Sequence, residues 1–292
     1  MGTDYALIVG VNCCPNFRLA DGSKPRPLRG AENDADAIAA LVVEQLGYAS
    51  ENVTILKGKA ATYTELKAHF VRLQKTLTSN DHLLFHFSGH GTQVADVKPF
   101  DEYDRDRLDE ALCLYDATAE GKNVLLDDTL GLWLEDLPAA RITILLDCCH
   151  AGTAIKDPDE SIQSRWLPIA RTTGKGEARP WSDLSGVAKS FRPQITALYA
   201  CHSEQQAYER LFITRKSAQR MGQFTHFLVE AVISRSADTD RNNEFTVSEL
   251  TTYIAKRLDE TYNRNRPRED QQRPSSDVSG DNVTLFSNSQ QP

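Results

Sequence analysis

The sequence predicts an α/β protein in which helices cover both faces of a central, mainly parallel sheet. Short apolar runs alternate along the chain with longer stretches in which apolar residues recur at helical spacing. This alternation is typical of crossover units that join parallel strands. Residues 142–146 are almost wholly apolar, and residues 82–87 are largely apolar, as expected of strands buried on both faces of a parallel sheet. Each run ends abruptly in a cluster of small and reactive residues.

The predicted elements follow in order from the N-terminus. We expect strands over residues 5–11, 53–56, 82–87, 142–146, 195–200 and 282–286, and a hairpin over 111–115 and 124–126. We expect helices over residues 31–46, 62–77, 129–137, 224–234 and 246–258. Capping-box patterns open the helices at Thr62 and Thr246. Residues 91–109 read as an acid-rich loop, and residues 153–194, rich in Pro, Gly, Ser, Arg and Lys, read as a functional or mobile segment.

Composition narrows the class of protein. The 292 residues carry a formal net charge of −8, which disfavours nucleic acid as a partner and suits partners that carry Lys or Arg. An apolar run of membrane-spanning length is missing, and the N-terminus lacks a signal-peptide pattern. The six cysteines match neither a disulfide framework nor a C-x-x-C zinc pattern. We therefore expect a cytoplasmic monomer with free thiols and no membrane partner.

The two buried strands end in residues suited to nucleophilic catalysis. Ser88-Gly89-His90-Gly91 follows one strand, and Asp147-Cys148-Cys149-His150-Ala151-Gly152 follows the other. The carboxyl ends of parallel strands border the crevice where α/β proteins bind ligands, so a thiol and an imidazole would meet there, as in a Cys-His hydrolase. The glycines leave backbone amides uncrowded, as an oxyanion hole requires. Adjacent residues on an extended chain point in opposite directions, and the residues alone do not choose between Cys148 and Cys149.

These two motifs, together with Leu28-Arg29-Gly30-x-x-Asn33-Asp34, resemble the metacaspases and their bacterial relatives, the orthocaspases, which are caspase-type cysteine peptidases. The resemblance extends over residues 5–286. It implies a single caspase-like α/β/α domain over residues 1–292. Within it, about 1–152 would correspond to the large subunit, 153–194 to a mobile linker and 195–292 to the small subunit.

The resemblance also implies the roles of the site residues. His90 would be the catalytic histidine and Cys149 the nucleophile of an endopeptidase, which leaves Cys148 as a packing residue. The backbone amides of Gly91 and Cys149 would bind the oxyanion. The chemistry requires no cofactor.

The specificity pocket implied by the resemblance consists of Asp34 and Asp147, with Ser88 nearby. Two buried carboxylates demand a cation, and a guanidinium can use both of them. Protein or peptide substrates would therefore be cleaved after Arg or Lys. Without the resemblance, Asp34 would equally suit a helix N-terminus, and Asp147 would equally suit a cap on the turn that follows its strand.

Two acidic clusters suggest calcium. Asp109, Asp127 and Asp128 lie where the family has three of its four calcium ligands; the fourth falls near Lys156, with Asp157 one place off. Separately, the loop that begins Asp238-x-Asp240-x-Asn242-Asn243 and places Glu249 twelfth imitates an EF-hand. The alternative for this loop is a polar turn followed by a capping box.

A basic linker beside an Arg/Lys-specific site is a target for self-processing. Arg179 and Arg192 precede proline, which most peptidases reject. The better candidates are Arg165, Arg171, Lys175 and Lys189. The alternative function is a catalytically weak caspase-like signalling scaffold, which the intact pair of His90 and Cys149 disfavours.

Overall fold

The computed structural model describes residues 2–95, 108–149, 161–168, 193–213, 218–278 and 283–287. Its central sheet has six strands in the order β13-β9-β7-β3-β1-β2. Their bounds are β1 Asp4–Gly10, β2 Val53–Lys57, β3 His82–Ser88, β7 Arg141–Asp147, β9 Gln194–Tyr199 and β13 Ser275–Asp277. Only β13 runs antiparallel to its neighbour among these strands. The prediction of a mainly parallel sheet is confirmed.

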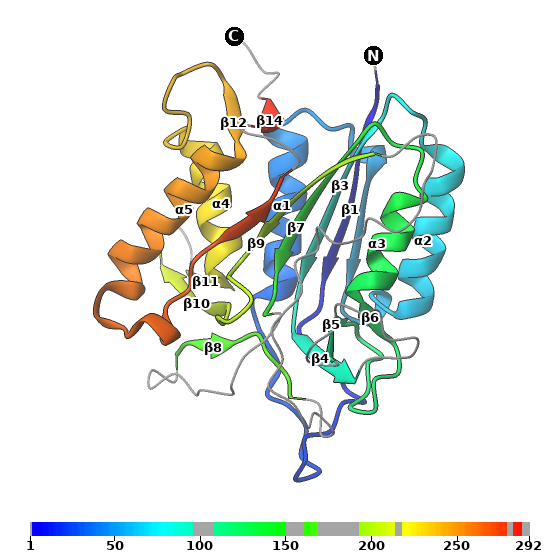
Figure 1. Ribbon diagram of the computed structural model, residues 1–292, viewed down its shortest axis with the longest axis vertical. Coiled ribbons are helices and arrows are strands. Elements are labelled where there is room, and N and C mark those ends of the chain that lie inside the picture. The colour runs from blue at the N-terminus through cyan, green and yellow to red at the C-terminus, as the bar shows by residue number, and fades with distance from the viewer. Residues whose placement is uncertain are drawn as a thin grey trace.

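Helices cover both faces of this sheet (Figure 1). Their bounds are α1 Ala31–Glu44, α2 Tyr63–Thr76, α3 Asp127–Glu135, α4 Gln223–Ser234 and α5 Val247–Thr261. Alternate residues of β1 enter two separate cores: Leu7 packs in the cluster that holds Phe70 of α2, and Ile8 packs in the cluster that holds Ile38 of α1. Because successive strand residues point to opposite faces, the apolar runs serve both layers. The three-layer α/β/α prediction is therefore confirmed.

The predicted helix starts have the expected caps. The Thr62 side chain accepts a hydrogen bond from the Glu65 N–H, and Thr246 and Glu249 form a reciprocal capping box. Such caps satisfy backbone N–H groups that have no partner inside the helix. Of the helices in the described ranges, none combines the length and the apolar character that a membrane crossing requires.

Smaller sheets flank the central one, and here the sequence prediction was incomplete. Strand β4 (Gly91–Ala95) pairs with β5 (Leu108–Cys113), which pairs with β6 (Val124–Leu126); the expected loop over 91–109 is therefore wrong at both ends. Strand β10 (Tyr208–Ile213) lies between β8 (Gln163–Ser164) and β11 (Ala218–Gly222). The predicted last strand appears as β14 (Thr284–Ser287), which pairs with β12 (Glu244–Thr246) instead of joining the central sheet.

Candidate active site

The register of the two central strands brings the predicted reactive residues together. Strands β3 and β7 are parallel neighbours in which Ser88 lies opposite Asp147. The chain beyond each strand therefore emerges at the same edge of the sheet, with His90 on one side and Cys149 on the other. Both are deeply buried: His90 is 3% exposed and Cys149 is 0% exposed.

The two adjacent cysteines face opposite layers, as the extended backbone requires. Cys148 packs in the core on the side of α2 and α3, and Cys149 packs in the core on the side of α1 and α4. Both thiols are fully buried. Burial raises the pKa of the Cys148 thiol well above its usual value, which suits a packing residue and opposes nucleophilic reactivity.

The thiol of Cys149 lies in a different environment. Its Sγ accepts a hydrogen bond from the Ala207 N–H at 3.0 Å. Burial alone would raise the pKa of this thiol, but hydrogen bonds, first from the Cys201 thiol and then from the Ala207 N–H, outweigh burial and lower the pKa. Hydrogen bonds donated to sulfur favour the thiolate, which is the nucleophilic form.

The imidazole of His90 is held neutral. Burial, and after it the nearby guanidinium of Arg165, lowers the pKa of His90 to about 3. Backbone groups of Arg165 and Arg26 favour the protonated ring, but they do not outweigh burial. The neutral imidazole has a nitrogen lone pair that can accept a proton, but a pKa this low makes it a weak base while Arg165 lies in the site.

The side chains predicted to form an acidic pocket lie together, and they surround an arginine of the same chain. Arg165 is 0% exposed. Its Nη2 lies 2.6 Å from Oδ2 of Asp34, its Nη1 lies 3.0 Å from Oδ1 of Asp147, and Nη1 donates a hydrogen bond of 2.7 Å to the Ser88 hydroxyl. A third carboxylate, that of Glu209 on β10, lies 3.6 Å from Nη2.

The carboxylates that face this guanidinium are held by contacts with other elements. The Ser88 hydroxyl donates to Asp34, and so does the Gly222 N–H. Thr225 donates to Asp147 from both its N–H and its hydroxyl. Burial raises the pKa of Asp34 to about 7, against the opposing pull of the Arg165 guanidinium. The pocket is thus a desolvated acidic slot that requires a cation.

Glu209 ties this slot to the start of α1. Its carboxylate accepts hydrogen bonds of 2.9 Å from the N–H groups of Arg29 and Gly30. A Cβ on Gly30 would lie 2.9 Å from the same carboxylate, so a glycine allows this close approach. The sequence prediction missed Glu209, because the apolar run that follows it in β10, Leu211-Phe212-Ile213, is short and the residues that hold its carboxylate lie far away in the sequence.

The backbone of Arg165 also lies in the site. The Gly91 N–H donates to the Arg165 carbonyl oxygen at 2.9 Å, and the Arg165 N–H donates to the Ala207 carbonyl at 3.0 Å. A Cβ on Gly91 would lie 1.6 Å from the carbonyl oxygen of Cys149. The close packing of these two backbones therefore depends on glycine at this position.

The linker prediction is wrong for the part of the segment that the structure describes. Residues 161–168 were expected in a mobile linker, but they include the short strand β8 and bury the side chain of Arg165. The other predicted processing residues, Arg171, Lys175 and Lys189, lie outside the described residues.

The three aspartates proposed for calcium influence one another. Burial, together with the charges of Asp128 and Asp109, raises the pKa of Asp127 to about 7, and a bound cation would relieve this repulsion. Oxygen ligands of this kind suit calcium. Their ligand atoms do not all lie within 4.8 Å of one another, whereas those of one other acidic group in the described ranges do. The donor chemistry fits calcium, and the spacing in this conformation is wider than a shared ion needs. Lys156 and Asp157 lie outside the described residues.

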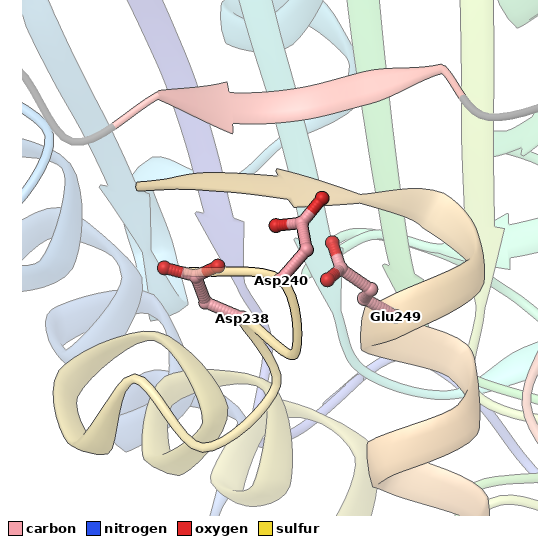
Figure 2. A group of neighbouring side chains, drawn as sticks. All are labelled: Asp238, Asp240 and Glu249. Atoms are coloured by element: carbon pink, nitrogen blue, oxygen red, sulfur yellow. The ribbon is translucent and has the colours of Figure 1, made fainter. Parts of the chain in front are cut away.

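That other group is the EF-hand-like loop, where Asp238, Asp240 and Glu249 lie close together (Figure 2). Each of their carboxylate oxygens accepts a hydrogen bond from within the loop or from the start of α5. Asn243 adopts the left-handed backbone expected at its position, with φ 64°. The carboxylates of this loop therefore have hydrogen-bond partners within the protein, as expected of a polar turn followed by a capping box.

Comparisons with known proteins agree with this architecture. A family model described as "Metacaspase, peptidase C14 domain" matches residues 5–158. A Metacaspase-1 from Candida glabrata is 34% identical over 165 residues, which are 54% of this chain and 39% of that protein. A Metacaspase-1B from Aspergillus fumigatus is 30% identical over 209 residues, which are 64% of this chain and 47% of that protein. The chain thus spans less than half the length of these curated relatives.

A solved structure extends the likeness over nearly the whole chain. The crystal structure of a protein from Geobacter sulfurreducens superposes with a TM-score of 0.64 at 25% sequence identity. The superposition covers 95% of this chain and 94% of that one. The similarity therefore includes the part of the chain beyond residue 158.

Proposed function

Because the chain belongs to the metacaspase family of C14 peptidases, we propose that it is a cysteine endopeptidase that cleaves peptide bonds after Arg or Lys. The observation that carries this proposal is the buried guanidinium of Arg165 among the carboxylates of Asp34, Asp147 and Glu209. An arginine side chain bound among these carboxylates supports the proposal that the slot accepts a cationic side chain. The proposed substrates are proteins or peptides.

The proposed reaction uses the residues at the ends of β3 and β7. The thiol of Cys149 gives its proton to the neutral imidazole of His90 and attacks the substrate carbonyl carbon. The oxyanion receives a hydrogen bond from the Gly91 N–H, which in this structure is donated to a carbonyl oxygen. His90 passes the proton to the leaving amine, and water then hydrolyses the thioester. No metal or organic cofactor takes part in these steps.

Specificity in this proposal comes from charge and shape together. Arginine offers a planar fork to two carboxylates and the Ser88 hydroxyl, whereas lysine offers a single charged centre. We therefore expect Arg substrates to be preferred over Lys substrates. An acidic residue would add a further negative charge to a buried acidic slot and would be rejected.

Two further elements belong to the proposal. Calcium activation would act through Asp109, Asp127 and Asp128, where a cation would offset the mutual repulsion. Self-processing would occur within residues 153–194 and would divide the single domain into a part like the large subunit and a part like the small subunit. A response to calcium is checked by measuring the melting temperature of the protein with calcium and with a chelator. We expect a higher melting temperature with calcium.

The test is kcat/KM of the purified chain on matched fluorogenic peptides that end in Arg, Lys or Asp, with and without millimolar calcium. We expect turnover of the Arg and Lys peptides only. Cys149→Ala should abolish turnover, and Cys148→Ala is the matched control because its thiol is equally buried but faces the other layer. If none of the peptides is cleaved with reductant and calcium present, the alternative of a catalytically weak signalling scaffold would be favoured.

A further inference from the structure

We propose that His86 is a counter-charge for the acidic slot formed by Asp34, Asp147 and Glu209: its imidazole is neutral while a guanidinium fills the slot and takes up a proton when the slot is empty. The inference rests on the proposed function for what fills the slot, a cationic side chain of the substrate. His86 acts on that side chain through the slot carboxylates, so it is a positioning residue and not a catalytic one.

His86 lies next to the slot, on the face of β3 that also carries Ser88. Residues two apart on a strand share a face and lie about 7 Å apart. The parallel register places Ser88 opposite Asp147. The Ser88 hydroxyl donates a hydrogen bond to Asp34 and accepts one from Arg165. The imidazole is therefore one position below the hydroxyl that joins the acids of the slot to the guanidinium.

The imidazole of His86 is buried without a hydrogen-bond partner among the described residues. The residue is 0% exposed, and this holds for both ring nitrogens. Buried polar groups are nearly always hydrogen-bonded, and an exception calls for a reason. The strand neighbours of His86 in the register are Ile8 of β1 and Leu145 of β7. An apolar side chain would suit these neighbours better, so packing does not account for a histidine here.

The charged groups that face His86 belong to the slot. Of the buried residues of α1, only Asp34 is titratable, and α4 buries no titratable residue. The slot adds Asp147 of β7, Glu209 of β10 and the guanidinium of Arg165. The other buried titratable members of this core are thiols and phenols, which carry no charge when protonated: Tyr48, Cys149, Cys201, Tyr208 and Tyr262.

The guanidinium and the carboxylates act on His86 in opposite directions. Burial, and after it the charge of Arg165, lowers the pKa of His86 to about 3, so the imidazole is neutral while the slot is filled. Without the guanidinium, the negative charges of the slot would favour the protonated imidazole. Asp34, whose pKa is already raised to about 7, would hold one proton. The charges of Asp147 and Glu209 would still favour a second proton on His86.

This proton would make the slot selective for cations. A cationic side chain that enters the slot supplies a positive charge, so His86 releases its proton to solvent. The affinity for such a side chain should therefore rise with pH. A neutral side chain supplies no charge and cannot replace the proton, so the empty slot is not left as an uncompensated group of acids that any side chain could relieve.

The experiment empties and refills the slot in the full-length chain. In Arg165→Ala, millimolar methylguanidinium replaces the removed end of the side chain, and methylurea is the matched neutral control. The protonation of each histidine is followed from about pH 5 to about pH 8 by NMR of isotope-labelled histidine. Because Arg165 also lowers the pKa of His90, the His86 signal is identified by its loss in His86→Gln.

We expect His86 to stay neutral over this range in wild type, and its titration midpoint to rise by at least about two pH units in Arg165→Ala. Methylguanidinium should reverse the rise, and methylurea should not. His82, at the other end of β3 and hydrogen-bonded to Thr143, should not respond. If Arg165→Ala fails to fold, adding Glu209→Gln removes one negative charge from the slot, and a smaller rise in the same direction is expected.

A His86 imidazole that stays neutral in Arg165→Ala would refute this inference, because the carboxyls would then hold every proton of the empty slot. Equal reversal by methylurea and methylguanidinium would also refute it, since the filling of space and not charge would then control the proton. Neither result depends on the cleavage of a peptide, which tests the proposed function separately.

Discussion

The replacement Asp34→Asn removes the charge from one carboxylate of the acidic slot with little change in volume. Oδ2 of Asp34 lies 2.6 Å from the guanidinium and accepts from Ser88, and the residue is 0% exposed. A hydrogen bond to a charged partner contributes about 1.5–3 kcal/mol, and a broken buried ion pair costs about 3–5 kcal/mol. Because Asp147 and Glu209 remain, we expect Asp34→Asn to lose about 2–4 kcal/mol of transition-state stabilisation. This corresponds to a fall of roughly 30- to 1000-fold in kcat/KM for an Arg peptide.

The loss should also depend on pH in a defined direction. The pKa of Asp34 is raised to about 7, so the wild-type carboxyl carries less charge at pH 6 than at pH 8. Asparagine resembles the protonated form at every pH. The deficit of Asp34→Asn relative to wild type should therefore shrink as the pH falls from 8 to 6.

The assay is kcat/KM on an Arg peptide at both pH values, with self-processed enzyme normalised by active-site titration. The control is Asp36→Asn, because Asp36 lies on the same helix with its side chain 53% exposed and pairs with Lys57 at the surface. Glu209→Gln should show a smaller loss than Asp34→Asn, since Glu209 lies farther from the guanidinium, at 3.6 Å. Equal kcat/KM for Asp34→Asn and Asp36→Asn would refute the assignment of the slot.

Other predictions concern the backbone donor and the aspartate cluster. In Gly91→Ala the added Cβ would clash with the Cys149 carbonyl and displace the Gly91 N–H, so kcat should fall by about 100-fold or more; an unchanged kcat would exclude this amide as an oxyanion donor. The Asp127 carboxyl titrates near 3.8 when unfolded and at about 7 when folded, so its contribution to stability falls as the pH rises between these values. When unfolding by urea is measured in the presence of a chelator, the free energy of unfolding of wild type should fall by up to roughly 4 kcal/mol relative to that of Asp127→Asn between pH 4 and pH 7.5. Parallel dependence of the two unfolding free energies on pH would contradict this. Calcium should raise the melting temperature of wild type more than that of Asp127→Asn, and equal shifts would place the ion elsewhere.

Local patterns predicted the features of the site that depend on short stretches of chain. The apolar runs identified β3 and β7, and their parallel pairing places His90 and Cys149 at one edge of the sheet. The capping pattern at Thr246 marked the start of α5. In each case neighbouring residues determine the outcome, since strand and helix periodicity arise from backbone geometry.

The occupant of the slot could not be predicted in this way. Arg165 occurs in a polar stretch without periodicity, and it is buried because acids from α1, β7 and β10 surround it; its contact with Asp34 spans 131 residues of sequence. Glu209 was missed for the same reason, because its partners Arg29 and Gly30 lie about 180 residues earlier. Burial of a charge depends on such distant partners, which no local pattern reports.

The most direct test of the central claim is to label self-processed enzyme with a thiol-reactive peptide probe that carries Arg at the position before its electrophile, and to map the labelled residue by tandem mass spectrometry. We predict a single modification on Cys149, prevented by excess Arg peptide and unaffected by a matched Asp peptide. Labelling of Cys148 or Cys13 instead, or labelling that the Asp peptide prevents equally well, would contradict the account.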